Sequence, residues 1–189
     1  TRFYADYASP VIVDSYESLD TIASVFEEDP GEGQRKSVIV DLAAQTAAPL
    51  ARWVKDSDLL GVMAELGVTV NFWHVADAGQ DSVDLLQRLI DTYGEGPNYF
   101  VVRNLGRGSD FSQLDGSPAL KQALDIGARV IVLPQLHEAS MRKIDRQNAS
   151  FWAAIHSRGG PDALGMLERQ RVKTWLKAAY EALDSLPVG

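Results

Sequence analysis

Short apolar runs that suit buried strands alternate with segments of helical periodicity along most of this chain of 189 residues. The predicted strands are Ser37–Leu42, Val68–Val75, Tyr99–Arg103 and Arg129–Leu133. The predicted helices are Glu17–Glu28, Ala47–Leu66 with Gly67 as its C-cap, Asp81–Tyr93, Pro118–Asp125, Glu138–Gln147, Ala149–Ser157 and Leu164–Leu186. Strands separated by helices of this length form right-handed βαβ units. The pattern therefore predicts an α/β fold with a doubly wound, mainly parallel sheet flanked by helices.

Length and composition narrow the class of protein further. We expect residues 1–189 to form a single α/β domain, because the chain shows no internal repeat and no second domain. The absence of cysteine excludes disulfides and thiolate metal sites and fits a reducing cytoplasm, where we expect the protein to act. No apolar run approaches the roughly 20 residues of a membrane helix, so no membrane association is expected. The formal net charge of -8 argues against tight nonspecific binding to a phosphate backbone.

Two polar residues follow predicted strands, where ligands bind in a doubly wound sheet. Asp41 comes at or near the end of the Ser37–Leu42 run, and a carboxylate there can hold a hydrated Mg²⁺ or position a water. Asp41 can equally cap the turn that follows. Asn104 ends the Tyr99–Arg103 strand, and its amide can offer a donor and an acceptor to a base. It can equally stabilise the turn by bonding its own backbone.

Other motifs are weaker. Gly106-Arg107-Gly108 lacks the third glycine of a dinucleotide loop and comes late in the chain, so a flexible loop is predicted. The histidines show no metal-ligand spacing, and His74 is interpreted as a satisfied core or rim residue. The carboxylates near the start of the Asp81–Tyr93 helix are interpreted as caps and solvated groups; they are Asp77, Asp81 and Asp84.

Two helices carry clusters of positive charge. The basic residues are Arg142, Lys143 and Arg146 in one helix and Arg169, Arg171, Lys173 and Lys177 in the last. A solvated face with acidic partners one turn away, such as Glu181, explains them. A local patch for DNA or a protein partner is the alternative.

Four segments, taken in order, resemble the ParA/MinD group of deviant P-loop ATPases, in particular the partition and mobilisation proteins of plasmids. The resemblance covers most of the chain from about Ser37 onward. The segments are Val38-Ile39-Val40-Asp41-Leu42-Ala43-Ala44-Gln45, Phe72-Trp73-His74-Val75-Ala76-Asp77-Ala78-Gly79-Gln80-Asp81-Ser82, Phe100-Val101-Val102-Arg103-Asn104 and Ile131-Val132-Leu133-Pro134.

The resemblance implies a P-loop NTPase-like fold that uses ATP and Mg²⁺. Asp41 would be the Walker B-type catalytic aspartate and would hold Mg²⁺ through water. Adenine would be bound by Asn104, together with Arg103 and the Pro134–Gln135 turn. The implied partners are a second copy in a homodimer and DNA or a DNA-bound adaptor protein.

One departure divides the functional hypotheses. The family begins with a strand, a glycine-rich loop with Lys-Ser or Lys-Thr, and a helix, and the sequence contains no such segment. We therefore expect that an N-terminal unit of about 30 to 40 residues, the size of one βα unit, is missing, or that the fold has been rebuilt around its loss. In the first case the chain is the larger part of an ATPase for plasmid partition, mobilisation or cargo positioning. In the second it is a non-hydrolysing binding or scaffold module, inactive as an enzyme.

Another doubly wound nucleotide or small-molecule enzyme is a third, weaker possibility. The coding sequence upstream of Thr1 separates the first two hypotheses. Calorimetry with ATP and Mg²⁺ is expected to show weak or no binding to these 189 residues.

Overall fold

The computed structural model describes residues 8–27, 35–43 and 45–186. The chain divides into two compact units, residues 3–70 and residues 71–189, and each is described by itself. None of the helices in the described ranges combines the length and apolar character needed to cross a membrane.

The first unit is helical where it has regular structure. Its helices are α1 (Tyr16–Ser24), α2 (Ala47–Asp56) and α3 (Leu59–Glu65). Ser15 caps α1, because its hydroxyl accepts a hydrogen bond from the Ser18 amide. Trp53 of α2 is buried. Its indole N–H donates a hydrogen bond to Asp20 Oδ1 of α1 at 2.8 Å, which connects the two helices.

Two expectations for the first unit need correction. The predicted helix 17–28 begins at Tyr16 and ends at Ser24; its predicted last residue, Glu28, lies outside the described residues. The predicted helix 47–66 is broken into α2 and α3, because Asp58 adopts a left-handed φ of 44°. Aspartate tolerates that conformation better than most residues, and Asp and Ser favour turns over helix interiors. Gly67 follows α3 with the positive φ expected of a C-cap.

The predicted strand Ser37–Leu42 is not a strand. These residues form neither helix nor strand, and the side chain of Ile39 is 96% exposed. A β-branched run favours extended backbone, but a strand exists only where a neighbouring strand completes its hydrogen bonds. No strand pairs with residues 37–42 in the described part of the chain.

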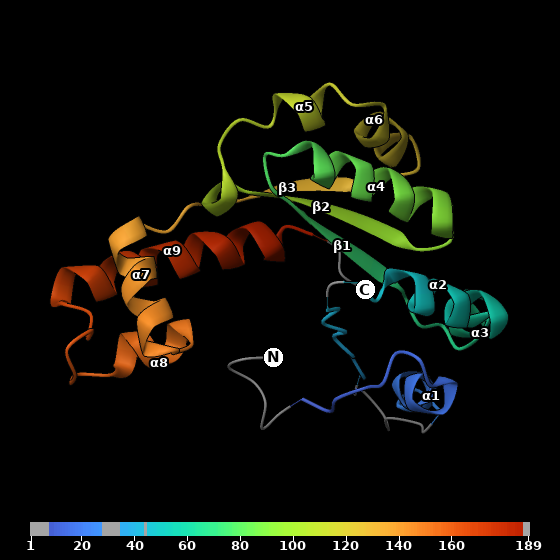
Figure 1. The fold of residues 1–189 in the computed structure, drawn as a ribbon, viewed down its shortest axis with the longest axis horizontal. Helices are drawn as coiled ribbons and strands as arrows, with labels where there is room; N and C mark the ends of the chain where they lie inside the picture. Colours follow the sequence, from blue (N-terminus) through green and yellow to red (C-terminus); the bar gives the residue numbers. More distant parts are fainter. Residues whose placement is uncertain (1–7, 28–34, 44, 187–189) are drawn as a thin grey trace. The chain divides into compact units, whose positions relative to one another are not determined.

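The second unit is an α/β structure built on a three-stranded parallel sheet in the order β1-β2-β3. The strands are β1 (Asn71–Ala76), β2 (Asn98–Asn104) and β3 (Arg129–Leu133), so three of the four predicted strands are confirmed. The connecting helices are α4 (Gln80–Tyr93), α5 (Ser112–Asp115) and α6 (Pro118–Asp125). Figure 1 shows these helices on one side of the sheet. Successive right-handed crossovers that advance in one direction place their helices on one face, as observed here.

Apolar side chains from both layers form the core between the sheet and these helices. Leu86 and Ile90 of α4 pack in one buried cluster with Tyr99 and Val101 of β2. The short helix α6 matches its prediction, because Ser117 caps it through the Leu120 amide and Pro118 occupies its first turn. Helix α5 and the 3₁₀ helix η2 (Leu105–Arg107) were not predicted.

The remaining helices form a second buried cluster. They are α7 (Glu138–Gln147), α8 (Phe151–His156) and α9 (Met166–Asp184), all close to their predicted bounds. Ile144, Leu164 and Val172 are almost fully buried in this cluster. Helix α9 also packs against β3, so the helical cluster is continuous with the sheet.

Candidate functional site

The carboxyl ends of the three strands lie at one edge of the sheet, which we call the carboxyl rim. It consists of Asp77, Arg103, Asn104, Pro134 and Gln135. The strand register pairs Ala76 with Arg103 and Asn104 with Leu133. Four of the five predicted site residues therefore follow or end neighbouring strands of one sheet.

Asn104 uses its side chain to stabilise the turn after β2. Its Oδ1 accepts a hydrogen bond from the Gly106 amide at 3.0 Å and so caps η2. The structural role that the sequence allowed for this residue is therefore present. In the described residues no partner lies within hydrogen-bond distance of its Nδ2 group. Asn104 thus keeps an uncommitted NH2 donor group at the carboxyl rim.

Arg103 points to the opposite face of the sheet from Asn104, because side chains alternate along a strand. Its Nη2 lies 2.5 Å from Asp115 Oδ1 of α5, in a pair that is 29% and 46% exposed. Its Nε is buried without a hydrogen-bond partner in the described residues. In this structure the guanidinium connects β2 to α5, on the side of the sheet away from Asn104.

Pro134 is fixed by the helical cluster. Its carbonyl oxygen accepts a hydrogen bond from Trp175 Nε1 of α9 at 2.6 Å. Gln135, the next residue, is exposed, and Leu136 is buried in the cluster of α7, α8 and α9. The turn after β3 is therefore held against the helical cluster, while Gln135 faces solvent.

The loop between β1 and α4 forms a small polar network at the same edge. Asp77 Oδ1 accepts hydrogen bonds from the Gly79 amide at 2.9 Å and from Ser82 Oγ at 2.8 Å. The Gly79 amide, followed by the Ser82 hydroxyl, lowers the pKa of Asp77, and the charges of Arg107 and His74 act in the same direction. The interpretation of Asp77 as the helix cap is wrong, because Gly79 is the N-cap of α4 and Asp77 instead stabilises the turn before the helix.

Gly106-Arg107-Gly108 lies beside the carboxyl rim and includes a helical turn, so it is not the plain loop that was predicted. Leu105–Arg107 form η2, and Gly108 has a φ of 133°. A Cβ atom placed on Gly108 would lie 2.6 Å from Ala78 Cβ, so the loops after β1 and β2 are in direct contact. A glycine two residues after another glycine could have signalled such a close approach, but the contact itself is tertiary.

His74 departs from its interpretation as a satisfied residue. It lies on the α4 face of β1, and its Nε2 is buried with no hydrogen-bond partner in the described residues. Burial lowers the pKa of His74, and the Ser82 backbone and Asp77 offset part of this effect. Burial therefore favours the neutral form of the imidazole, and its Nε2 has no hydrogen-bond partner among the described residues.

Asp41 belongs to the first unit, so its position relative to the carboxyl rim is not described. It is exposed, in a segment without helix or strand. Within the described ranges, no three His, Asp or Glu side chains are grouped so that they could hold a metal ion. The magnesium role of Asp41 stays a prediction.

The Asp77 network leads to a testable pH dependence. We expect the Asp77 carboxyl to titrate below its ordinary pKa of 3.8, and the Ser82→Ala variant to move that pKa upward. A depressed folded-state pKa favours folding above the unfolded-state pKa, and this contribution is lost as the pH falls through the folded-state pKa. Carboxyl ¹³C NMR titration of both proteins measures it. A midpoint at or above 3.8 in the unmodified protein would contradict the network.

Comparisons with known proteins identify no relative of this chain. No protein-family model matches the sequence, no curated protein matches it, and no solved structure matches the fold. Arguments about function therefore depend on the geometry of the rim and on the resemblance seen in the sequence.

Proposed function

We propose that the carboxyl rim binds the base of an adenine nucleotide, and that the chain is the nucleotide-binding part of a ParA/MinD-like ATPase. In this proposal the fold is doubly wound and P-loop NTPase-like. The observation that carries it is the pairing of Asn104 with Leu133, which brings an uncommitted amide donor next to the Pro134 turn. Ligands of open parallel sheets bind outside the carboxyl ends of the strands, where both residues lie.

Three of the rim residues have a role that suits a purine base. The Nδ2 group of Asn104 donates a hydrogen bond to a ring nitrogen of adenine, while Oδ1 continues to cap η2. The ring of Pro134 offers an apolar surface to one face of the base, and the exposed Gln135 can reach its edge. Arg103 acts indirectly, because its pair with Asp115 holds the end of β2 against α5.

The proposal assigns ATP and Mg²⁺ as cofactors, with Asp41 binding Mg²⁺ through water. Mg²⁺ keeps several waters and needs phosphate oxygens besides one carboxylate, so a single aspartate fits a metal that arrives with a nucleotide. Bound ATP and Mg²⁺ would supply the phosphoryl group and the charge that neutralises it. The process served would be plasmid partition, mobilisation or the positioning of cellular cargo.

The ion pairs of α7 favour a DNA-bound adaptor protein as the partner over direct contact of α7 with DNA. The cations of α7 are each paired with a carboxylate: Arg142 with Glu138, Lys143 with Glu168 at 2.7 Å, and Arg146 with Asp162 at 2.8 Å. Paired cations release fewer counterions on binding a phosphate backbone, which weakens nonspecific DNA binding.

The Asn104→Asp substitution tests the base contact. Aspartate keeps an oxygen that can cap Gly106, removes the Nδ2 donor and adds a negative charge. Adenosine, which is uncharged, is therefore titrated beside ADP to separate the lost donor from repulsion of the phosphates. We expect ADP at millimolar concentration to shift the NMR signals of Asn104 and Pro134–Leu136. The Asn104→Asp substitution should raise the dissociation constant about tenfold, which corresponds to the loss of one hydrogen bond. Two-dimensional NMR titration measures both effects.

Asn98→Asp is the matched control, because Asn98 lies at the other end of β2 and bonds Asn71. This variant should bind ADP as the unmodified chain does. Equal shifts with ADP and CDP, or an unchanged affinity in Asn104→Asp, would contradict the proposal.

A second candidate, a non-hydrolysing binding or scaffold module, is favoured by one observation. The segment that carries Asp41 is neither strand nor helix in the described residues, so it does not present a carboxylate from a strand end. Micromolar binding of ATP and Mg²⁺ by this polypeptide in calorimetry, followed by phosphate release, would exclude the scaffold hypothesis.

A further inference from the structure

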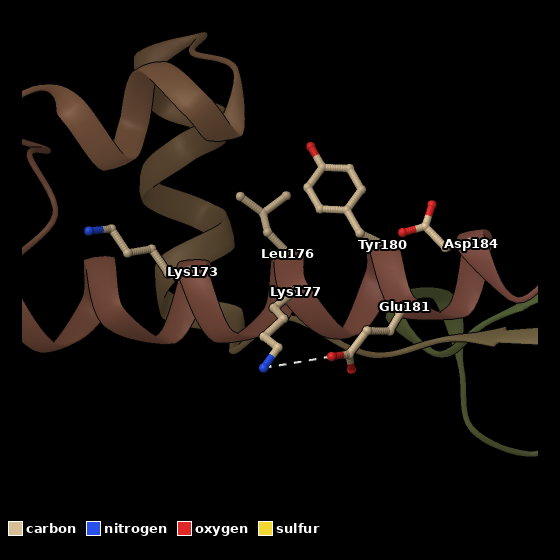
Figure 2. A pocket seen from close by; sticks show the side chains of 6 residues that line it. All are labelled: Lys173, Leu176, Lys177, Tyr180, Glu181 and Asp184. Atoms are coloured by element: carbon tan, nitrogen blue, oxygen red, sulfur yellow. Dashed lines mark ion pairs between the residues drawn. The ribbon is translucent and has the colours of Figure 1, made fainter.

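Helix α9 carries a stripe of side chains that lines a shallow, open hollow on the surface of the helix. Figure 2 shows Lys173, Leu176, Tyr180 and Asp184 along the helix, spaced by three or four residues. Lys177 and Glu181 flank them, and the hollow measures about 450 Å³. Tyr180 is 59% exposed, and Leu176 is half-buried. We call these six residues the α9 stripe.

The charges of the α9 stripe are separated along the helix. The two lysines stand toward its N-terminus and the two acids toward its C-terminus. In the described part of the chain, Lys173 and Asp184 have no ion-pair partner, and Lys177 and Glu181 form one exposed pair at 3.7 Å. The apolar atoms of the stripe therefore lie between a positive end and a negative end.

This order of charges is unfavourable for an isolated helix. The C-terminal turn of a helix carries partial negative charge and is stabilised by cations. The last turn of α9 contains no basic residue and instead holds Asp184, with Glu181 one turn earlier. Cations from outside the helix would remove this unfavourable interaction.

We propose that the α9 stripe binds the same stripe of a second copy of this chain, with the two helices antiparallel around a twofold axis near residue 178. In this arrangement Leu176 faces Tyr180 of the second copy, and the contact occurs twice by symmetry. Lys173 and Lys177 then lie opposite Asp184 and Glu181 of the second copy. A parallel arrangement would place like charges opposite each other, which disfavours it.

The interface is small, so the dimer is weak. One pair of helices buries less area than a standard stable interface, and the formal net charge of -8 on each copy opposes association. We expect a dissociation constant on the order of 100 µM. This dimer needs no nucleotide, which distinguishes it from a homodimer formed around ATP and makes it independent of the proposed function.

Charge reversal tests the proposal by sedimentation equilibrium without nucleotide. The variant Lys173→Glu/Lys177→Glu should weaken self-association at least about tenfold, and so should Glu181→Lys/Asp184→Lys, because each leaves like charges opposed. An equimolar mixture of the two variants should associate again, because the acidic stripe of one variant then lies opposite the basic stripe of the other. The quadruple variant that exchanges all four charges restores every pair and should recover the dissociation constant of the unmodified chain.

The matched control is Arg88→Glu/Lys121→Glu, which changes the net charge as much as the lysine variant but lies on exposed positions of α4 and α6. It should associate as the unmodified chain does, apart from the small effect of net charge. Circular dichroism verifies that each variant is folded. If one double variant unfolds, the other double variant and the quadruple variant still test whether the charges of the α9 stripe control self-association. A chain that stays monomeric at 1 mM, or a quadruple variant that fails to recover, overturns the proposal.

Discussion

Replacing Leu86 by alanine is expected to lower the free energy of unfolding of the second unit by about 3 kcal/mol. Leu86 of α4 is fully buried in the cluster that joins the helices α4 to α6 with the sheet. Its truncation removes apolar contacts on all sides and leaves a cavity, because close-packed neighbours relax only in part. A loss of this size is a large share of the stability of an ordinary domain.

The neighbouring residue on α4 provides the control. Leu85 is 54% exposed, so Leu85→Ala should change the free energy of unfolding by no more than about 0.5 kcal/mol. Because the chain has two units, amide hydrogen exchange in β2 is the appropriate measurement, since it reports the opening of the sheet alone. Equal effects of the two substitutions would mean that α4 does not cover the sheet as observed.

Most elements of the second unit, all but α5 and η2, were predictable because their signals are local. Strand β3 and helix α6 have the bounds expected from an apolar run and from a Ser-Pro start. The alternation of strands and helices was sufficient to predict parallel pairing, because short right-handed crossovers allow few alternatives. Asn104 was singled out by the rule that ligands bind at strand ends, whereas Pro134 came from the family resemblance alone.

The predictions that were wrong concern segments whose structure depends on distant partners or on single backbone angles. Ser37–Leu42 has the composition of a buried strand, but composition does not supply the neighbour that a strand needs. The break between α2 and α3 depends on the left-handed conformation of Asp58, which helical periodicity does not reveal. The spatial relation of Asp41 to Asn104, on which the ATPase hypothesis depends, stays a prediction.

Gly108→Ala is the second substitution for which a large effect is expected, about 3 kcal/mol in the free energy of unfolding. Two costs combine. The φ of 133° is unfavourable for any residue with a Cβ, and the added methyl would lie 2.6 Å from Ala78 Cβ. The loops after β1 and β2 must then separate.

Gly127→Ala isolates the first cost, because Gly127 also has a positive φ, of 91°, but nothing lies within 4 Å of its added Cβ. Its destabilisation should be about 1 kcal/mol. The difference between the two variants measures the contact of Gly108 with Ala78, and Ala78→Gly in the Gly108→Ala background should recover most of that difference. Amide hydrogen exchange in β2 provides all three values for the second unit.

The same set of variants connects stability with the proposed binding site. Gly106, whose amide is capped by Asn104, lies two residues before Gly108, so separating the loops should displace the Asn104 amide as well. Gly108→Ala is therefore expected to abolish the ADP-dependent NMR shifts under conditions where the protein is still folded, while Gly127→Ala retains them. Retained binding in folded Gly108→Ala would show that the contact between the two loops does not position the rim.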